Sequence, residues 1–181
     1  MTDLSTTAER FFERYAFPYW LRDHSRLVGA IGGTLARARV AAGDRLDVEA
    51  VTLAAYLHDI GRSPLMAGDP REHNDLSALI LAAEGLTSCV EPARRHAIYT
   101  VLDPATTPRT LEEKIVYIAD RRGGMKVESI EERAKDTAAR HPRFAAEIAR
   151  AIPLARVIER EVFAGLPFAP DALAAHVVVP T

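Results

Sequence analysis

The chain has 181 residues, of which 48% are hydrophobic and 27% are charged. This length and composition are typical of one compact, water-soluble domain, so we treat residues 1–181 as a single domain. Lys and Arg number 23 against 25 Asp and Glu, and the formal net charge of -2 argues against the broad basic surface that binds nucleic acid.

Residues 1–14 carry charges where a secretory signal has an apolar core, and no apolar run reaches the ~20 residues that span a bilayer. The single Cys89 can form no internal disulfide, which fits a reducing compartment. We therefore expect a cytoplasmic protein that does not enter the membrane.

The first strongly periodic segment is residues 19–42. Its apolar side chains recur at the spacing of one α-helical face, namely Trp20, Leu27, Ile31 and Leu35. His24 lies on the same stripe, and Gly43 follows as a stop signal. A helix is therefore predicted here, with His24 on the side that faces the core.

A second helix is predicted to begin after Asp47, a residue suited to the N-cap, and to run to His58 before Gly61 and Pro64 end it. Residues 63–71 contain two prolines and a glycine and are predicted to form a loop. A third helix is expected over about residues 72–84, with His73 near its start.

A fourth helix is predicted to begin near Val90 and to carry His96. Thr110 precedes Glu113 by three residues, which is the spacing of a capping box. A fifth helix therefore begins at this point and runs to Asp120.

The C-terminal part is predicted to form helices over residues 128–140 and 142–163, the second interrupted or kinked at Pro153. Residues from Pro167 onward are expected to be loose or to dock on a partner. No alternating segment is long enough for a strand. The expected fold is all-α, a helical bundle with its core at about residues 19–124 and packing helices at about 128–165.

His58 and Asp59 stand together at the end of an apolar helix, and both side chains are good ligands for divalent transition metals. An isolated pair of this kind is more often a buried histidine followed by a capping aspartate. His24 and Asp120 change that balance, because burying such groups in a core costs several kcal/mol unless they are paired or bind a metal. The four residues therefore predict a shared metal site.

In the order and the flanking residues of this set, the chain resembles the HD superfamily, and more closely its HDIG-type members. His24, the run His58-Asp59-Ile60-Gly61, and Asp120 carry the resemblance, which covers about residues 19–124. It implies an all-α HD domain whose metal is held by His24, His58, Asp59 and Asp120.

His73 and His96 occupy places where some HD enzymes hold a second metal, with Asp59 as the bridge. The bacterial symmetrical diadenosine-tetraphosphate hydrolases have this fuller set, and the chain looks like a relative of them. The alternative for each histidine is a polar residue early in a helix or on the surface. After Asp120 that group continues with an aromatic, acidic and proline-containing segment, whereas residues 121–124 here read Arg-Arg-Gly-Gly.

The resemblance implies a metal-dependent phosphohydrolase that cleaves a phosphoester or phosphoanhydride of a nucleotide-like substrate with a metal-activated water. It implies one or two divalent ions per chain, with iron or manganese favoured and cobalt, nickel, zinc or magnesium as alternatives. Asp59 and Arg62 are the expected catalytic residues. Arg62 would neutralise charge on the phosphoryl oxygens, although it equally fits a residue that complements a helix dipole. Arg121 and Arg122 are weaker candidates for phosphate contacts.

Two alternative functions share these residues, a cyclic-nucleotide phosphodiesterase and a non-catalytic module that binds a metal or a nucleotide. Product analysis separates the first alternative, and bound metal without turnover marks the second. The expected partner is a small phosphorylated molecule, and a homodimer through the C-terminal helices stays open.

Overall fold

A computed structural model describes residues 4–180, and within that range the chain forms α-helices, short 3-10 helices and no strand. The prediction of an all-α fold is therefore confirmed. The α-helices are α1 (Leu4–Arg14), α2 (Tyr19–Ala41), α3 (Val48–Leu57), α4 (His73–Ala83), α5 (Thr87–Arg94), α6 (Leu111–Arg122), α7 (Ile130–Arg140) and α8 (Ala145–Phe163). The 3-10 helices are η1 (Ile60–Arg62), η2 (Pro64–Met66), η3 (Ile98–Leu102), η4 (Pro142–Phe144) and η5 (Pro170–Ala175).

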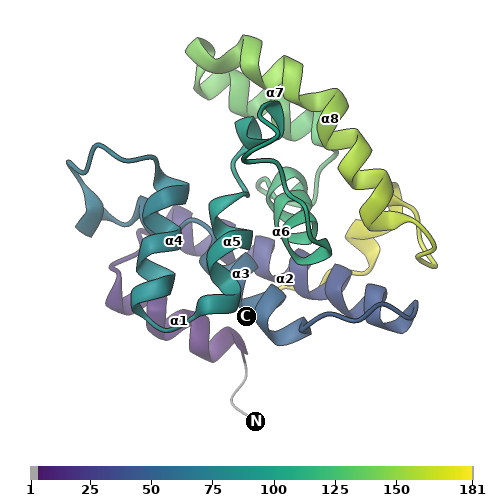
Figure 1. Ribbon diagram of the computed structural model, residues 1–181, viewed down its shortest axis with the longest axis horizontal. Coiled ribbons are helices and arrows are strands. Elements are labelled where there is room, and N and C mark those ends of the chain that lie inside the picture. Colours follow the sequence, from purple (N-terminus) through teal and green to yellow (C-terminus); the bar gives the residue numbers. More distant parts are fainter. Residues whose placement is uncertain (1–3, 181) are drawn as a thin grey trace.

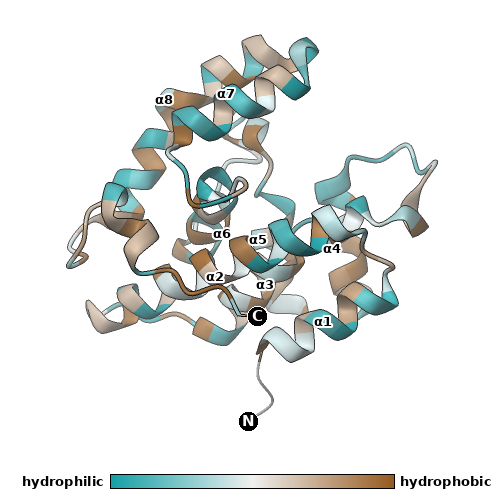
Figure 2. Ribbon diagram, turned by 180° about the vertical axis from the view of Figure 1, so that it is seen from behind, coloured by the Kyte–Doolittle hydropathy of each residue, from teal (hydrophilic) through white to brown (hydrophobic). Residues whose placement is uncertain are grey.

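The helix α2 lies inside the molecule, where it packs against α3 and α6, and α5 packs against α3, α4 and α6 (Figure 1). The outer helices cover this group, with α1 on α3 and α8 across α6 and α7. Brown and teal residues alternate along α8 in Figure 2, as expected for a helix that packs on one side only. No helix among residues 4–180 is long and apolar enough to cross a membrane.

Local capping sets the starts of two helices as the sequence predicts. The Asp47 side chain accepts a hydrogen bond of 2.9 Å from the Ala50 backbone N–H at the start of α3. At the start of α6, Thr110 and Glu113 form the predicted capping box, each side chain accepting from the other residue's backbone N–H. These bonds satisfy N–H groups that would otherwise have no partner at a helix start.

Small residues allow α2 and α3 to approach closely. A Cβ added at Gly32 would lie 2.6 Å from the Ala55 Cβ, and one added at Gly29 would lie 2.3 Å from the Tyr56 ring. Both distances are shorter than van der Waals contact, so only glycine fits at these positions. The close contact of the two helices brings His24 and His58, one on each helix, to the same side of the core.

Two helices differ from the prediction: α1 was not predicted, and α5 has other bounds. The helix α1 is not among the predicted elements, although its Ala8 and Phe12 are fully buried against the core. The predicted helix from about Val90 through His96 is wrong in its bounds, because α5 ends at Arg94 and His96 follows it. The Asn74 side chain donates to the Arg94 carbonyl at 2.7 Å and so satisfies a carbonyl at the helix end.

The predicted interruption at Pro153 is absent, since α8 runs through it from Ala145 to Phe163 and residues 142–144 form η4. Proline removes the hydrogen bond to the carbonyl four residues earlier, that of Ala149. Ala149 is exposed, so water can satisfy this carbonyl oxygen.

The segment after Pro167 is not loose, because it docks on its own chain, and its docking on a partner stays a prediction. Leu173 is fully buried, and the Phe168 ring stacks on His176 with centroids 4.1 Å apart. Arg122 joins the segment to the core: it donates to the Pro170 carbonyl at 2.7 Å and pairs with the buried Glu159 at 2.9 Å. A buried ion pair with both partners hydrogen-bonded fixes this arrangement.

We expect Gly32→Ala to destabilise the fold, because the new Cβ meets the Ala55 Cβ on a packed helix that cannot yield locally. Overpacking costs about 1–3 kcal/mol and exceeds the gain in helix propensity of about 1 kcal/mol. The measurement is thermal unfolding by circular dichroism. Gly33→Ala is the matched control, because its neighbours are the Thr52 side chain and the flexible end of Arg37, at 3.0 and 3.1 Å. Equal melting temperatures for the two variants would contradict close packing at Gly32.

Candidate metal centre

The structure brings all six predicted metal ligands to one place. They come from separate segments: His24 from α2, His58 and Asp59 from the end of α3, His73 from the first residue of α4, His96 from the turn after α5, and Asp120 from α6. Residues far apart in the sequence thus face one another in the core.

One group of ligand atoms forms what we call the first position. The His24 Nε2 atom lies 3.2 Å from both the His58 Nε2 atom and the Asp120 Oδ1 atom, and 3.9 Å from the Asp59 Oδ2 atom. Two atoms that each lie about 2.0–2.2 Å from one metal ion are about 2.8–3.6 Å apart at tetrahedral or right angles. His24, His58 and Asp120 can therefore bind a single cation together.

The other carboxylate oxygen of Asp59 faces a different set of atoms, which we call the second position. Its Oδ1 atom lies 3.2 Å from the His96 Nε2 atom and 3.5 Å from the His73 Nε2 atom. Because Oδ2 faces the first position, Asp59 stands between the two sets. This is the place that the resemblance gave to a bridging ligand.

Backbone contacts set the orientation of two buried imidazoles. The His58 Nδ1 atom lies 2.8 Å from the Ala55 carbonyl oxygen, and the His96 Nδ1 atom lies 2.5 Å from the Ala93 carbonyl oxygen. A carbonyl only accepts, so each Nδ1 carries a proton and each neutral ring directs the lone pair of Nε2 at the centre. Such contacts are typical of the surroundings of metal-binding histidines.

The surroundings favour the neutral form of His58 and His73 and the charged form of Asp59 and Asp120. Burial lowers the pKa of His58 and of His73 to about 3, against the opposing attraction of Asp59. Burial alone would raise the pKa of Asp59 and Asp120, but neighbouring positive and hydrogen-bonding groups hold both well below the usual value. Arg62 is the main such group for Asp59, and Arg121 for Asp120. Neutral imidazoles beside carboxylates are the protonation states that metal binding requires.

Arg62 lies at the second position itself. Its Nε donates to the Asp59 Oδ1 atom at 2.8 Å, and its Nη2 lies 3.0 Å from the His73 Nε2 atom. The guanidinium therefore occupies the side of Asp59 that faces His73. Gly61 makes this approach possible, because a Cβ there would lie 2.1 Å from the His73 carbonyl oxygen.

Two further arginines flank Asp120, and sequence reasoning missed one of them. Arg121 on α6 pairs with the Asp120 Oδ2 atom, and its guanidinium lies over the Tyr117 ring. Arg133 on α7 places its Nη2 atom 3.8 Å from the Asp120 Oδ1 atom. Nothing in the local sequence marks Arg133, because its helix is rich in exposed charges. Arg122, weighed beside Arg121 as a phosphate contact, pairs with Glu159 instead.

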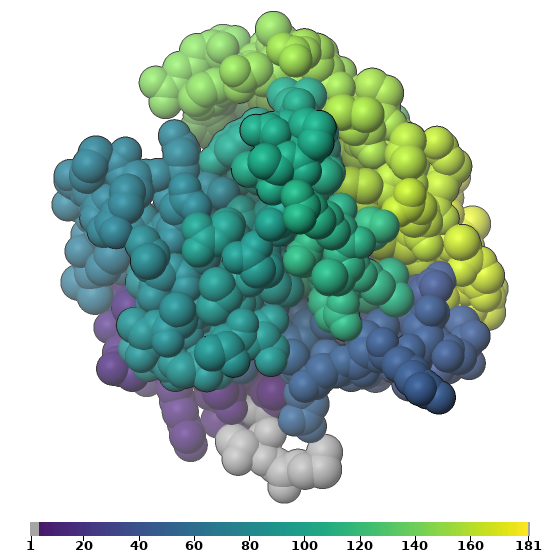
Figure 3. Space-filling model, viewed as in Figure 1, coloured from purple at the N-terminus to yellow at the C-terminus, as the bar shows by residue number. Residues whose placement is uncertain are grey.

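The centre is deeply buried at two of its histidines and partly exposed at Arg62. The side chains of His58 and His96 are 0% and 1% exposed, whereas that of Arg62 is 42% exposed. In Figure 3 the surface is hollowed between the tip of α7 and α8 and the loop of residues 63–72.

The donor set suits a divalent metal. Two buried carboxylates and several imidazole nitrogens converge, and the Nε2 atoms of His58 and His96 each lie 3.2 Å from another candidate ligand atom, of His24 and of Asp59 respectively. Imidazole and carboxylate ligands together fit iron, manganese, cobalt, nickel or zinc. The residues present therefore fit the cation that the sequence predicts.

Comparison with known proteins agrees with this geometry. A family model described as HD domain matches residues 21–125, which contain every ligand discussed above and make up more than half of the chain. No curated protein and no solved structure gives a significant match. The chain belongs to the HD domain family.

Proposed function

We propose that this protein is a metal-dependent phosphohydrolase that acts on a small, nucleotide-like phosphorylated substrate. One observation carries the proposal. The Nε2 atoms of His24 and His58 each lie within 3.9 Å of a carboxylate oxygen of Asp59 and of one of Asp120. Hydrolases are common in the HD domain family, which supports this reaction class. The convergence of buried groups supports a complete site rather than a degenerate one.

We assign His24, His58, Asp59 and Asp120 to the first position, with iron or manganese as the favoured ion. A divalent cation there would supply a Lewis acid for the phosphoryl oxygen and lower the pKa of a bound water toward ~7. The protein contributes by fixing the orientation of the ligand side chains before the substrate binds. His58 and His96 are oriented by backbone carbonyls, so little reorganisation is needed when the substrate binds.

We assign to Arg62 a contact with the substrate, in addition to its ion pair with Asp59. Its side chain is partly exposed and reaches from the edge of the centre inward, so its free N–H groups can donate to a phosphoryl oxygen. Arginine is suited to this task because its planar fork matches two phosphate oxygens. The pair with Asp59 would hold the guanidinium in place before the substrate arrives.

The second position is assigned to Asp59, His73 and His96, but Arg62 competes with a cation there. A positive guanidinium 2.8 Å from the Asp59 Oδ1 atom repels a metal ion and occupies a lone pair that the ion would need. We therefore propose one tightly bound cation per chain, with a second one bound only when Arg62 moves away.

One prediction of the proposed function concerns the ligands of the first position. His58→Ala is expected to remove nearly all bound metal and to lower kcat/KM by at least about 100-fold, since loss of even an outer partner of a ligand costs 10-fold to 100-fold. His176→Ala is the matched control, because His176 is exposed on the C-terminal segment and stacks on Phe168. Metal content is measured by mass spectrometry of the elements, and turnover with added manganese on mononucleotides, dinucleoside polyphosphates and cyclic nucleotides. Full activity in the His58 variant would rule out the proposal.

Another prediction concerns the competition between Arg62 and a cation at the second position. Arg62→Gln is expected to raise the metal content from about one to about two ions per chain, because the competing positive charge is removed. The double variant Arg62→Gln, His73→Ala should return to about one, since it lacks a ligand of the second position. The readout is metal content after dialysis against manganese. Two ions in the unmodified protein, unchanged in Arg62→Gln, would contradict competition by Arg62.

A further inference from the structure

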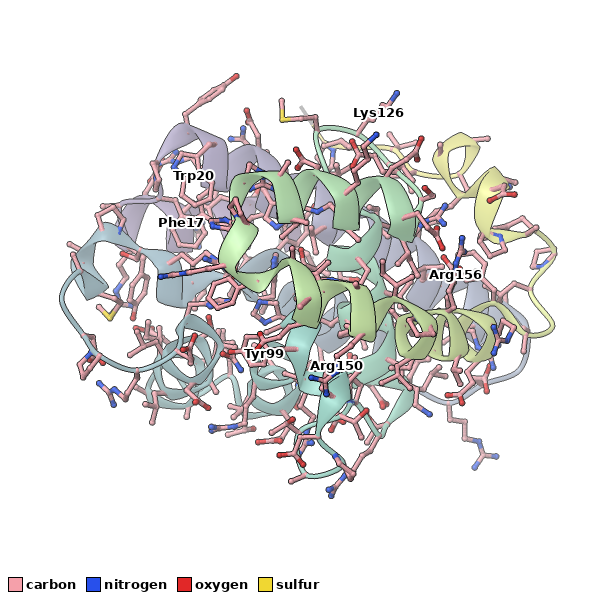
Figure 4. The ribbon with its side chains drawn as sticks, turned by 90° about the horizontal axis from the view of Figure 1, so that it is seen from above. Phe17, Trp20, Tyr99, Lys126, Arg150 and Arg156 are labelled. Carbon is pink, nitrogen blue, oxygen red and sulfur yellow. The ribbon has the colours of Figure 1, made fainter. Side chains whose placement is uncertain are left out.

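Arg133 belongs to the site although it comes from outside the family match. The matched residues end at 125, and α7 begins at Ile130. Ile130 and Ala134 are buried and hold α7 against the molecule, and Arg133 follows Ile130 by three residues, a spacing that places both on one face of the helix. Seen from above in Figure 4, α7 and the start of α8 lie across the molecule between the labelled Trp20 and Tyr99.

The guanidinium of Arg133 is poorly paired for a group so little exposed. Its side chain is 16% exposed, and its shortest distance to a carboxylate among residues 4–180 is 3.5 Å, to Asp136. Asp136 is itself bound more closely by Arg140, at 2.8 Å. The Arg133 Nε atom is buried with no hydrogen-bond partner in the described part of the chain. The removal of this charge from water costs free energy, which carboxylates at these distances offset poorly. A bound anion would offset it.

Arg121 adds to the same excess of positive charge. It lies beside Asp120, and its Nε is also buried without a partner among the described residues. Around the ligand atoms, the guanidinium groups of Arg62, Arg121 and Arg133 face the carboxylates of Asp59 and Asp120, and Asp136, which also lies near Arg133, is offset by Arg140. The imidazoles are neutral as ligands. The side chains thus carry one net positive charge, and a divalent cation would raise this to three.

This charge discriminates between classes of phosphate. A diester phosphate carries a single negative charge, whereas a monoester phosphate carries about -1.5 to -2 at pH 7 and has three oxygens that accept hydrogen bonds. The more strongly charged group offsets the excess positive charge better. It also offers enough oxygens for Arg121 and Arg133, which lie beside Asp120, to bind it together with Arg62, which lies beside Asp59.

We propose that Arg133, with Arg121, forms a recognition site for a terminal phosphate, and that this pair selects phosphomonoesters or chain-end phosphates over diesters. The proposal rests on the proposed function for its chemistry, because it names the substrate class of the same site. It disfavours the cyclic-nucleotide phosphodiesterase reading, since a cyclic nucleotide presents a diester. Arg133 is a specificity-determining residue here, contributed by the helix that follows the matched domain.

The test compares Arg133→Gln with Arg140→Gln in the manganese-loaded protein. Both variants lose one arginine charge from α7, but the Arg140 side chain is 51% exposed, and its carboxylate partner in the described part of the chain is Asp136. Binding of inorganic phosphate is measured by calorimetry, and kcat/KM with para-nitrophenyl phosphate and with bis(para-nitrophenyl) phosphate. Metal content is checked in each sample.

We expect Arg133→Gln to weaken phosphate binding about 10-fold to 100-fold, the effect of losing a charge-assisted hydrogen bond, at unchanged metal content. The monoester kcat/KM should fall by a similar factor and the diester value much less. Arg133→Lys should recover part of the loss, and Arg140→Gln, which keeps Arg133 but frees Asp136 to pair with it, should lower phosphate binding far less than Arg133→Gln does.

The outcomes separate this inference from the proposed function. Phosphate binding that depends on Arg133 in a protein that hydrolyses nothing would support the recognition site and count against hydrolysis. Hydrolysis that is lost in His58→Ala but unaffected, together with phosphate binding, by Arg133→Gln would overturn the recognition site and leave the hydrolase standing. A diester preferred over the monoester in the unmodified protein would also overturn it.

Discussion

Two carboxylates buried among helices are the constraint around which this molecule is arranged. Asp59 and Asp120 are 5% and 4% exposed, and an unpaired charge at that depth would cost several kcal/mol. Each is therefore surrounded by groups that favour its charged form, with Arg62 beside Asp59 and Arg121 beside Asp120. The same surroundings leave ionised oxygens facing neutral imidazole nitrogens, which is the condition for binding a metal.

Close packing of the backbone is what allows these groups to meet. Gly32 lets α2 lie against α3, and Gly61 lets the turn after Asp59 lie against the start of α4. At both positions any side chain would overlap with its neighbour, so the spacing of the helices and the spacing of the ligands depend on the same residues. The Gly61 N–H also donates to the Ser77 hydroxyl at 2.9 Å, which fixes α4, and with it His73, relative to Asp59.

The centre is built from two parts of the chain with different tasks. The segment that matches the HD domain family supplies every proposed ligand atom, and it holds them on, or just after, helices that pack inside the molecule. The helices that follow it cover one side and are fastened by the buried pair of Arg122 with Glu159. Arg133 on α7 brings positive charge to the edge of the centre, so the choice of substrate is proposed to depend on helices beyond the family segment.

The sequence by itself determined most of the helices, though not α1 or the end of α5, because the signals it carries are local. Apolar periodicity, the Asp47 cap and the Thr110 capping box act within a few residues, and the order of histidines and aspartates identified the ligand candidates. Tertiary structure alone decided where these side chains meet. The end of α5 before His96 depends on Asn74 of another helix, and the docking of the C-terminal segment depends on Arg122. Likewise, Arg62 at the second position and Arg133 beside Asp120 follow from contacts between segments far apart in the chain, and short-range patterns carry no information about such contacts.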